Sequence, residues 1–519
     1  MVEITTPPPK IRWAVFAALA LLALAVRLPQ LGERPMHTDE AINGYITGEL
    51  LAGQSFHYDP RDRHGPALFL LVEPVVRLCG AKNFSELTER ELRLSTALTG
   101  AATVLLFGAG VEMFGFIACF LAALLFAVAP LPVYYSRYFI HESLFVFATF
   151  GLILSGWRAQ QKKSVALAAL AGFFAALMLA GKETTVLHFF ALLLAAVGVR
   201  LWSVRLRSRA ATAPQIVRQD NCLLPTHPRL PKMILAASAA FVFTFILLFT
   251  WFGRNWQALA DLFHAAVNFT ARAGGQGHEK PFWYYAKLLC DGWSGTAVLL
   301  LTAIGMISII RQFLGRPKLH PLAPRIFLAV YALAIFAIYS AIPYKTPWLA
   351  LNFWLAIALL AGIALEWIWF ATKKISVRAA ILVFLAGLGI LLAHDTRERV
   401  FKNPADETNP YAYAHTTEDI LGLPARIAEA ARAQNLAQPR IAVIARDAWP
   451  LPWYLRNFSN VGYWQPEQTP GPADFFITTT DVPDALAKRL KDFRPDFFGV
   501  RPNVLLILWT PPKTVSQHE

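Results

Sequence analysis

The first residues suited to chemistry are two adjacent carboxylates, Asp39 and Glu40, in the string His37-Thr38-Asp39-Glu40. They follow an apolar segment long enough to cross a membrane, where charge is costly unless it is solvated, paired or used. One interpretation is structural, with Thr38 or Asp39 capping a helix that begins near Ala41 and acids favouring its positive end. The other is catalytic, because a positioned carboxylate can act as a general base.

Basic residues beside later apolar segments supply the complementary charge. Arg137 lies in an aromatic string, and Lys345 lies between Tyr344 and the sequence Thr346-Pro347-Trp348. Each alone could be a helix-end charge whose stem lies along the membrane. Together with the carboxylates, they are what a site for an anionic, lipid-borne substrate needs. The other charged residues predicted at this face are Lys182, Glu183, Glu142 and Arg254.

The elements that must position these residues are about eleven apolar segments, each long enough, at roughly 17–25 residues, to span a bilayer. They are predicted at 12–29, 92–112, 115–134, 141–157, 165–181, 184–200, 233–253, 294–310, 325–342, 347–366 and 377–393. The first resembles a signal peptide but lacks a clear small-residue cleavage site, so we interpret it as a retained anchor.

Orientation follows from the basic loops. If the N-terminus is cytoplasmic, the loops 158–164, 201–232, 311–324 and 367–376 face inward, and they are almost free of acids. Their basic residues are Arg158, Lys162, Lys163, Arg205, Arg207, Arg209, Arg218, Arg229, Lys232, Arg311, Arg316, Lys318, Lys373 and Lys374. The positive-inside rule then places every candidate site residue on the outer face, in the loops 30–91, 135–140 and 254–293 and the junctions near 182 and 345.

Composition supports the same class. The 519 residues are 56% hydrophobic and 16% charged, with a formal net charge of +14. Soluble domains are about 45–50% apolar and about 25% charged, so the chain is a predicted polytopic helical membrane protein rather than a disordered one. Nucleic acid is not an expected partner, because the basic residues are scattered between apolar blocks.

Two regions outside the spans are predicted to fold. The 30–91 loop is longer than a helix connection requires, and 66–78 is predicted to be an interfacial helix or a re-entrant segment. Residues 394–519 alternate helix-like pieces with short strands at 440–444, 461–464, 474–478 and 503–509, predicting a small extracytoplasmic α/β domain after a transmembrane domain at 1–393. Its aromatic residues could pack in a core or stack on sugar rings; they are Trp449, Trp453, Tyr454 and Trp464.

These motifs, in this order, resemble the GT-C superfamily of membrane glycosyltransferases, especially the family-39, protein-mannosyltransferase-like and aminoarabinose-transferase-like group. The strings that carry the resemblance are Asp39-Glu40, His64-Gly65-Pro66-Ala67-Leu68, Arg90-Glu91-Leu92-Arg93-Leu94-Ser95 and Gly181-Lys182-Glu183. A narrower likeness is to the flippase-activity-associated, glycosyltransferase-like subfamily. It rests on Thr38-Asp39-Glu40-Ala41, His64-Gly65-Pro66, Tyr344-Lys345-Thr346-Pro347-Trp348 and the string from Trp449 to Arg456. Gly65 departs from the group, many members of which have Pro there.

The resemblance implies a GT-C-like fold and an inverting transfer of a hexosyl or pentosyl group from a polyprenyl-phosphate donor at the outer face of the cell membrane. Asp39 would be the general base, and Glu40 would orient the acceptor or Asp39 itself. The donor phosphate would be bound by Arg137, Lys345 and, more weakly, Lys182. The substrate-orienting residues would be His64, Glu142 and Tyr344.

Several alternatives stay open. The acceptor could be a glycan, a lipid or a protein, and a divalent metal at the acidic motif is neither required nor excluded. The main rival is a lipid-linked-sugar flippase or flippase-associated protein, although the predicted spans lack the mid-membrane charges and two-fold repeat typical of transporters. A non-catalytic sugar-binding protein is the second rival.

Overall fold

The computed structural model describes residues 7–59, 64–210, 228–262, 264, 274, 277–314 and 322–512, with no side-chain description for 205–210. Parts of the expected loops 201–232, 254–293 and 311–324, including Arg218, Arg316 and Lys318, lie outside the described residues. The chain divides into two compact units. The first comprises Met1–Pro29, Ser55–Leu71 and Leu94–Lys402, and the second comprises Gln30–Gln54, Val72–Arg93 and Asn403–Glu519.

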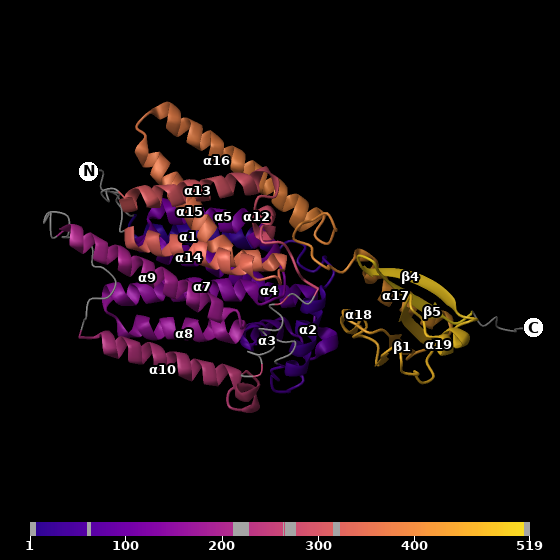
Figure 1. The fold of residues 1–519 in the computed structure, drawn as a ribbon. Helices are drawn as coiled ribbons and strands as arrows, with labels where there is room; N and C mark the ends of the chain where they lie inside the picture. The colour runs from indigo at the N-terminus through magenta and orange to yellow at the C-terminus, as the bar shows by residue number, and fades with distance from the viewer. Residues whose placement is uncertain are drawn as a thin grey trace, which may run out of the picture. The chain divides into compact units, whose positions relative to one another are not determined.

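The first unit is helical (Figure 1). Its first helices are α1 (Pro9–Arg27), α4 (Glu89–Phe114), α5 (Phe116–Val128), α6 (Pro130–Ser136), α7 (Glu142–Lys162), α8 (Val165–Gly181) and α9 (Thr185–Ala210). The later ones are α10 (Leu230–Phe249), α12 (Tyr284–Leu289), α13 (Gly292–Leu314), α14 (Leu322–Ala341), η3 (Pro347–Ala350), α15 (Leu351–Ala371), α16 (Ile375–Thr396) and η4 (Arg397–Lys402).

A helix lies at every expected span, but not every helix is long and apolar enough to cross a membrane. In the described part of the chain eight qualify, and a ninth is the pair α5 and α6, bent by 59°. The remaining predicted spans correspond to α7 and α8, which fall outside this length and composition criterion. The bend follows from Pro130, which has no N–H to continue α5 and instead begins α6. The apolar helix α8 has only 17 residues, and α7 carries charged residues at both ends.

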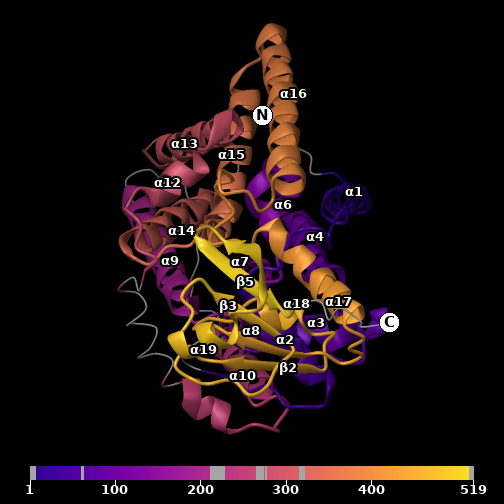
Figure 2. The same ribbon diagram turned by 90° about the vertical axis from the view of Figure 1, so that its right-hand side faces the viewer.

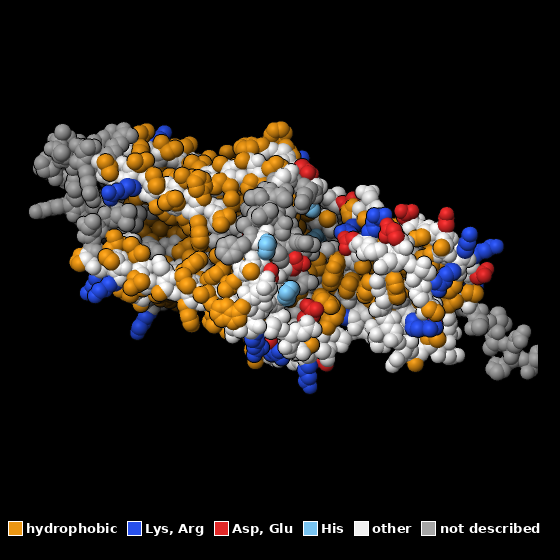
Figure 3. Space-filling view, turned by 60° about the horizontal axis from the view of Figure 1, so that its bottom comes forward, with side chains coloured by type: hydrophobic (Ala, Val, Ile, Leu, Met, Phe, Trp, Pro, Cys, Tyr) orange, Lys and Arg blue, Asp and Glu red, His pale blue; other side chains and the backbone are white. Residues whose placement is uncertain are grey.

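Close helix packing centres on α15, whose membrane window is 94% buried. A Cβ at Gly362 of α15 would lie 2.3 Å from the Ala118 carbonyl oxygen of α5. On its other side, a Cβ at Gly305 of α13 would lie 2.1 Å from the Leu360 carbonyl oxygen of α15. Small residues let membrane helices approach backbone to backbone. The outer helices expose large apolar side chains instead, and Figure 3 shows these over much of the helical unit on the face in view.

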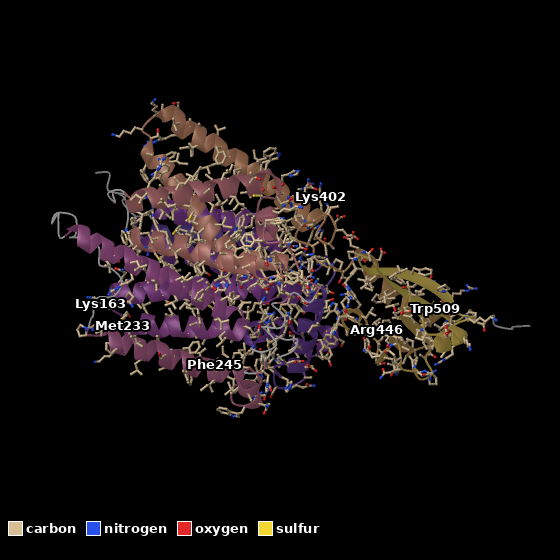
Figure 4. The ribbon with its side chains drawn as sticks, in the orientation of Figure 1. Lys163, Met233, Phe245, Lys402, Arg446 and Trp509 are labelled. Atoms are coloured by element: carbon tan, nitrogen blue, oxygen red, sulfur yellow. The ribbon has the colours of Figure 1, made fainter. Side chains whose placement is uncertain are left out.

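The helical unit has two chemically different ends. At one end, here called the basic end, Arg12 and Arg158 both pair with Glu112, and two further arginines lie over indole rings. Those two pairs are Arg311 with Trp367 and Arg378 with Trp369. The opposite end, here called the site end, carries the connections at 137–141, 182–184 and 342–346. In Figure 4, Lys163 and Met233 lie at the basic end and Lys402 lies at the site end.

The second unit combines the loop around α2 (Thr38–Leu51) with the C-terminal domain. Its helices are α18 (Leu451–Tyr454), α17 (Leu423–Ala433), α19 (Asp484–Arg489), η1 (Phe84–Glu86) and η5 (Glu418–Gly422); α3 (Ala67–Cys79) begins in the first unit and ends in the second. Its strands are β1 (Arg440–Ile444), β2 (Asn460–Trp464), β3 (Phe475–Thr479), β4 (Arg494–Arg501) and β5 (Val504–Thr510).

These strands form one mixed sheet in the order β2-β1-β3-β5-β4 (Figure 2). Strand β1 pairs in parallel with β2 and β3, whereas β5 pairs antiparallel with β3 and β4. Leu486 and Leu490 pack on Ala442, Ile444 and Phe476 to form the core of the domain. The prediction of a small C-terminal α/β domain is confirmed, although β4, which contains Pro495 and Gly499, was not predicted.

Candidate functional site

The acidic pair lies at the start of α2, and the residue that caps this helix is His37. Its Nδ1 accepts a hydrogen bond from the Asp39 backbone N–H at 3.1 Å, and Glu40 Oε2 accepts one from the His37 backbone N–H at 3.3 Å. The expected cap, Thr38 or Asp39, was therefore wrong by one or two positions. Burial lowers the pKa of His37, against the opposing effect of the two carboxylates, and the neutral ring keeps the lone pair that the cap requires.

Glu40 is enclosed and fully paired. Arg93 Nε donates to its Oε1 at 2.8 Å, and Arg93 Nη2 donates to its Oε2 at 2.8 Å. Arg34 Nη2 lies 3.4 Å from both oxygens. The Arg93 guanidinium also donates to the backbone carbonyls of Leu31, Arg34 and Pro35. Because one arginine joins the carboxylate to the preceding chain, Glu40 holds the loop that presents Asp39.

Of the two adjacent carboxylates, Asp39 is the one exposed to solvent. Its side chain is 46% exposed, and its Oδ1 lies 3.9 Å from Nδ1 of the neutral His37 ring. Its carboxylate forms no hydrogen bond with the part of the chain that the structure describes. Consecutive residues on a helix point about 100° apart. Asp39 therefore faces outward while Glu40 faces the core.

The other predicted residues lie in the first unit, and Arg137 is held there by backbone carbonyls. It caps the C-terminus of α6, donates through Nη1 to the carbonyls of Arg27 and Pro29 at 2.5 Å each, and lies 4.7 Å from the Phe401 ring. Nη1 is therefore already engaged by two backbone carbonyls, which argues against the expected bidentate phosphate grip through this atom.

Lys345 is a buried cation held by backbone carbonyls. Its Nζ donates to the carbonyls of Lys280 at 3.1 Å and Ile342 at 2.5 Å, and the residue is only 1% exposed. Among the described residues, no carboxylate lies within ion-pairing distance of this ammonium. Loss of hydration lowers the pKa of Lys345. Its neighbour Tyr344 is half-buried, with its ring 4.8 Å from that of His278.

Lys182, by contrast, is already neutralised. Its Nζ pairs with Glu142 Oε1, and both side chains are buried. Lys182 ends the helix α8 and Glu142 begins α7, so this ion pair closes the site end of a helix hairpin. Lys182 and Glu142 thus neutralise each other. The positive charge of Lys182 is therefore less suited to binding the donor phosphate than the sequence suggested.

His64 contacts the carboxylate of Glu183, a residue that was not among the predicted site residues. Its Nδ1 lies 2.8 Å from Glu183 Oε2, and Tyr58 donates to Glu183 Oε1 at 2.9 Å. Burial alone would raise the pKa of Glu183, but the interactions with His64 and Tyr58 outweigh it and lower the pKa to about 2. The ring of His141 lies 5.1 Å from that of His64, and its buried Nε2 has no hydrogen-bond partner in the described part of the chain.

The structure thus brings His64, Glu142 and Lys182 into one region at the site end, with Glu183 and His141 as additional members. Asp39 and Glu40 belong to the second unit. No group of three or more His, Cys, Asp or Glu side chains among the described residues is arranged to hold a metal ion, so nothing here favours the divalent metal that the sequence left open.

The aromatic string of the C-terminal domain has a mainly structural role. Trp453 is fully buried and donates through Nε1 to Glu89 at 2.6 Å. Tyr454 is also buried, and its hydroxyl accepts from the Met36 N–H at 2.8 Å. Packing is therefore the better interpretation for these two rings, and it fixes the chain just before the acidic motif.

Comparison with known proteins places this geometry in context. Residues 64–217 match the family model described as dolichyl-phosphate-mannose-protein mannosyltransferase. The fold is similar to that of ArnT from Cupriavidus metallidurans bound to undecaprenyl phosphate, with a TM-score of 0.60 and 14% identity over 97% of this chain and 98% of that one. No curated protein matches the sequence.

A second similar structure is the archaeal oligosaccharyltransferase AglB from Archaeoglobus fulgidus in complex with an inhibitory peptide and a dolichol-phosphate. Its TM-score is 0.55, with 14% identity over 97% of this chain and 76% of that one. ArnT and AglB are both members of the GT-C superfamily. The chain is therefore a multi-span membrane protein with the fold of these GT-C structures, as the resemblance of its motifs to that superfamily implied. The narrower likeness to the flippase-activity-associated subfamily stays a prediction.

Proposed function

We propose that this protein is an integral-membrane glycosyltransferase that moves a sugar from a polyprenyl-phosphate donor to an acceptor at the outer face of the cell membrane. The N-terminus would be cytoplasmic and the domain at 394–519 extracytoplasmic. The observation that carries the proposal is the contrast between two charges. Lys345 is a buried ammonium without a carboxylate partner among the described residues, and Asp39 is an exposed carboxylate at the capped start of α2.

A buried cation is costly unless an opposite charge accompanies it. The donor phosphate would supply that charge, and more of it as the sugar leaves. Lys345 therefore binds the transition state more strongly than the ground state, which is the requirement for catalysis. Arg137 adds a second positive charge, which is fixed in position by its bonds to Arg27 and Pro29. ArnT is bound to undecaprenyl phosphate and AglB to a dolichol-phosphate in the similar structures, which supports this class of donor.

The reaction at the anomeric carbon is a single displacement. Asp39 takes the proton of the acceptor hydroxyl as the acceptor oxygen forms a bond to the anomeric carbon. The bond from that carbon to the phosphate oxygen breaks, and its electron pair stays on the polyprenyl phosphate. Attack from the face opposite the phosphate inverts the anomeric configuration. Glu40 acts through Arg93 to position Asp39 and touches no substrate.

The experiment compares Lys345→Met with Lys287→Met, which removes an exposed lysine from the neighbouring helix α12. Binding of polyprenyl phosphate and turnover of a panel of polyprenyl-phosphate sugars are measured in nanodiscs. Removing a charge that stabilises a transition state lowers the rate by about 10²–10³-fold. We expect this loss for Lys345→Met only. Equal activity of both variants would contradict the proposal, and transbilayer movement of an intact lipid-linked sugar without turnover would favour the flippase.

A further inference from the structure

A cluster of aromatic side chains in the second unit takes no part in the reaction proposed above. It joins Tyr45 of α2, Phe84 of η1 and Trp449, which lies just before α18. The Tyr45 ring centroid lies 5.5 Å from that of Phe84, with an interplanar angle of 80°, and 5.9 Å from that of Trp449, with an angle of 73°. All three residues belong to the compact unit that also contains Asp39.

Two glycines of α2 allow the rings of this cluster to pack on the helix backbone. A Cβ at Gly48 would lie 2.6 Å from Phe84 Cβ, and a Cβ at Gly44 would lie 2.7 Å from Trp453 Cζ3. Phe84 is in turn in edge-to-face contact with the buried Trp453, with 5.8 Å between the ring centroids. Because neighbouring side chains fix the positions of the rings, a ligand that binds them would have little side-chain ordering to impose.

The outer side of the cluster is accessible to solvent. Tyr45 is 37% exposed, Trp449 is half-buried, and Tyr463 of the edge strand β2 is 42% exposed. Loss of hydration raises the pKa of Tyr463, and the phenol of Tyr45 raises it further, so the two tyrosines are neighbours. Trp464 differs from them, because it packs against the core of the C-terminal domain. We call Tyr45, Trp449 and Tyr463 the aromatic platform.

Polar groups border the aromatic platform. Glu49 follows Tyr45 by one turn of α2, so the two side chains share a face of the helix. Asp447 Oδ1 accepts the Trp449 backbone N–H at 3.1 Å, and its Oδ2 lies 2.9 Å from Arg501 Nη2. A sugar ring has an apolar face of C–H groups and a rim of hydroxyl donors. Aromatic rings bordered by carboxylate acceptors match both parts of it.

We propose that the aromatic platform binds sugar rings of the acceptor, so that the acceptor is a glycan. The inference rests on the proposed function, in which the start of α2 presents Asp39 to the acceptor hydroxyl. Tyr45 follows Asp39 by six residues, which is about 9 Å along the helix axis at 1.5 Å per residue. The glycan must therefore be longer than one sugar ring to reach both residues.

The charges around the platform disfavour a lipid surface as its occupant. Carboxylates border it at Glu49, at Asp447 and at Glu86, which follows Phe84 by two residues on η1. Anionic lipid headgroups attract basic segments and repel carboxylates. A glycan hydroxyl carries no charge and instead donates a hydrogen bond to a carboxylate.

The test measures binding of the full-length protein in nanodiscs, without donor, to an array of oligosaccharides and peptides. The oligosaccharide that binds best is then titrated by calorimetry. Tyr45→Ala and Trp449→Ala remove a ring, whereas Tyr45→Phe and Trp449→Phe keep one. Phe497→Ala is the matched control, because it removes an exposed ring from β4, at the opposite edge of the sheet from β2. We expect each of the two alanine variants at the platform to weaken binding by about tenfold or more. The phenylalanine variants and Phe497→Ala should retain it.

Three results would overturn the proposal. They are binding to no oligosaccharide, as expected of a lipid-facing surface, binding to peptides alone, and equal affinity of the wild type, Tyr45→Ala and Trp449→Ala. Turnover supplies a separate readout: Tyr45→Ala should raise the KM for the acceptor and leave kcat unchanged, because it removes binding that is equal in the ground and transition states. Oligosaccharide binding that depends on the platform, without turnover of any donor, would contradict the proposed function alone. The two failures are therefore distinguishable.

Discussion

Replacing Glu40 with Gln should loosen the start of α2 rather than remove a reacting group. The carboxylate is inaccessible and forms a two-point ion pair with Arg93. Removing one partner of a buried pair costs about 3–5 kcal/mol. The glutamine carbonyl can still accept one hydrogen bond from the guanidinium, which recovers about 1.5–3 kcal/mol. The expected net destabilisation is therefore about 2 kcal/mol.

Hydrogen–deuterium exchange of the α2 amides is the direct assay. A loss of about 2 kcal/mol corresponds to roughly a 30-fold increase in exchange through local opening. Asp39→Asn is the matched control, because an exposed side chain with no hydrogen bond to the described residues should change stability by no more than about 0.5 kcal/mol. If Glu40→Gln leaves α2 exchange unchanged while turnover falls as far as in Asp39→Asn, Glu40 takes part in the chemistry and our assignment is wrong.

Two further predictions concern pH. The pKa of Glu183 is lowered to about 2 from 4.5, so its contribution to stability is fully present above pH 4.5 and is lost as the pH falls toward 2. At 1.36 kcal/mol per unit this is about 3 kcal/mol. Glu183→Gln should therefore flatten the acid limb of thermal unfolding between pH 5 and 3, and an unchanged limb would contradict the pairing with His64. The pKa of His37 is also lowered, so its capping contribution is complete above about pH 6.5 and declines below it. Exchange of α2 amides, corrected for the intrinsic rate, should rise from pH 7.5 to 5.5 in the wild type and become pH-independent in His37→Asn, which keeps a capping oxygen.

Hydropathy and charge predicted the membrane helices because each helix that lies in lipid must itself be apolar along its length. The apolar helices, the basic end and the C-terminal α/β domain could all be predicted from segments of the sequence considered singly. At α7 and α8 the apolar windows correctly predicted helices, although α8 is only 17 residues long and α7 is charged at both ends. Strand β4 was not predicted because it contains Pro495 and Gly499, which are unfavourable in strands. Its pairing with β5 stabilises it instead.

The candidate site was predictable only in part, because ion pairing is a tertiary property. Asp39 and Glu40 look equivalent in the sequence, yet Arg93, distant along the chain, encloses one and leaves the other exposed. Lys182 and Lys345 likewise look alike, but only Lys182 has a carboxylate partner among the described residues. The motif Gly181-Lys182-Glu183 contains both a lysine and a carboxylate, and only Lys182 was predicted to be a site residue.

The central claim is that Asp39 is the base in sugar transfer from a polyprenyl-phosphate donor. Its most direct test is the rate at which purified Asp39→Asn and wild-type protein convert a polyprenyl-phosphate sugar to polyprenyl phosphate in the presence of acceptor, followed by mass spectrometry. Loss of a general base lowers a rate by about 10²–10⁴-fold. We predict a loss in that range with unchanged thermal unfolding. Equal rates for the two proteins on a donor that the wild type consumes would contradict the account.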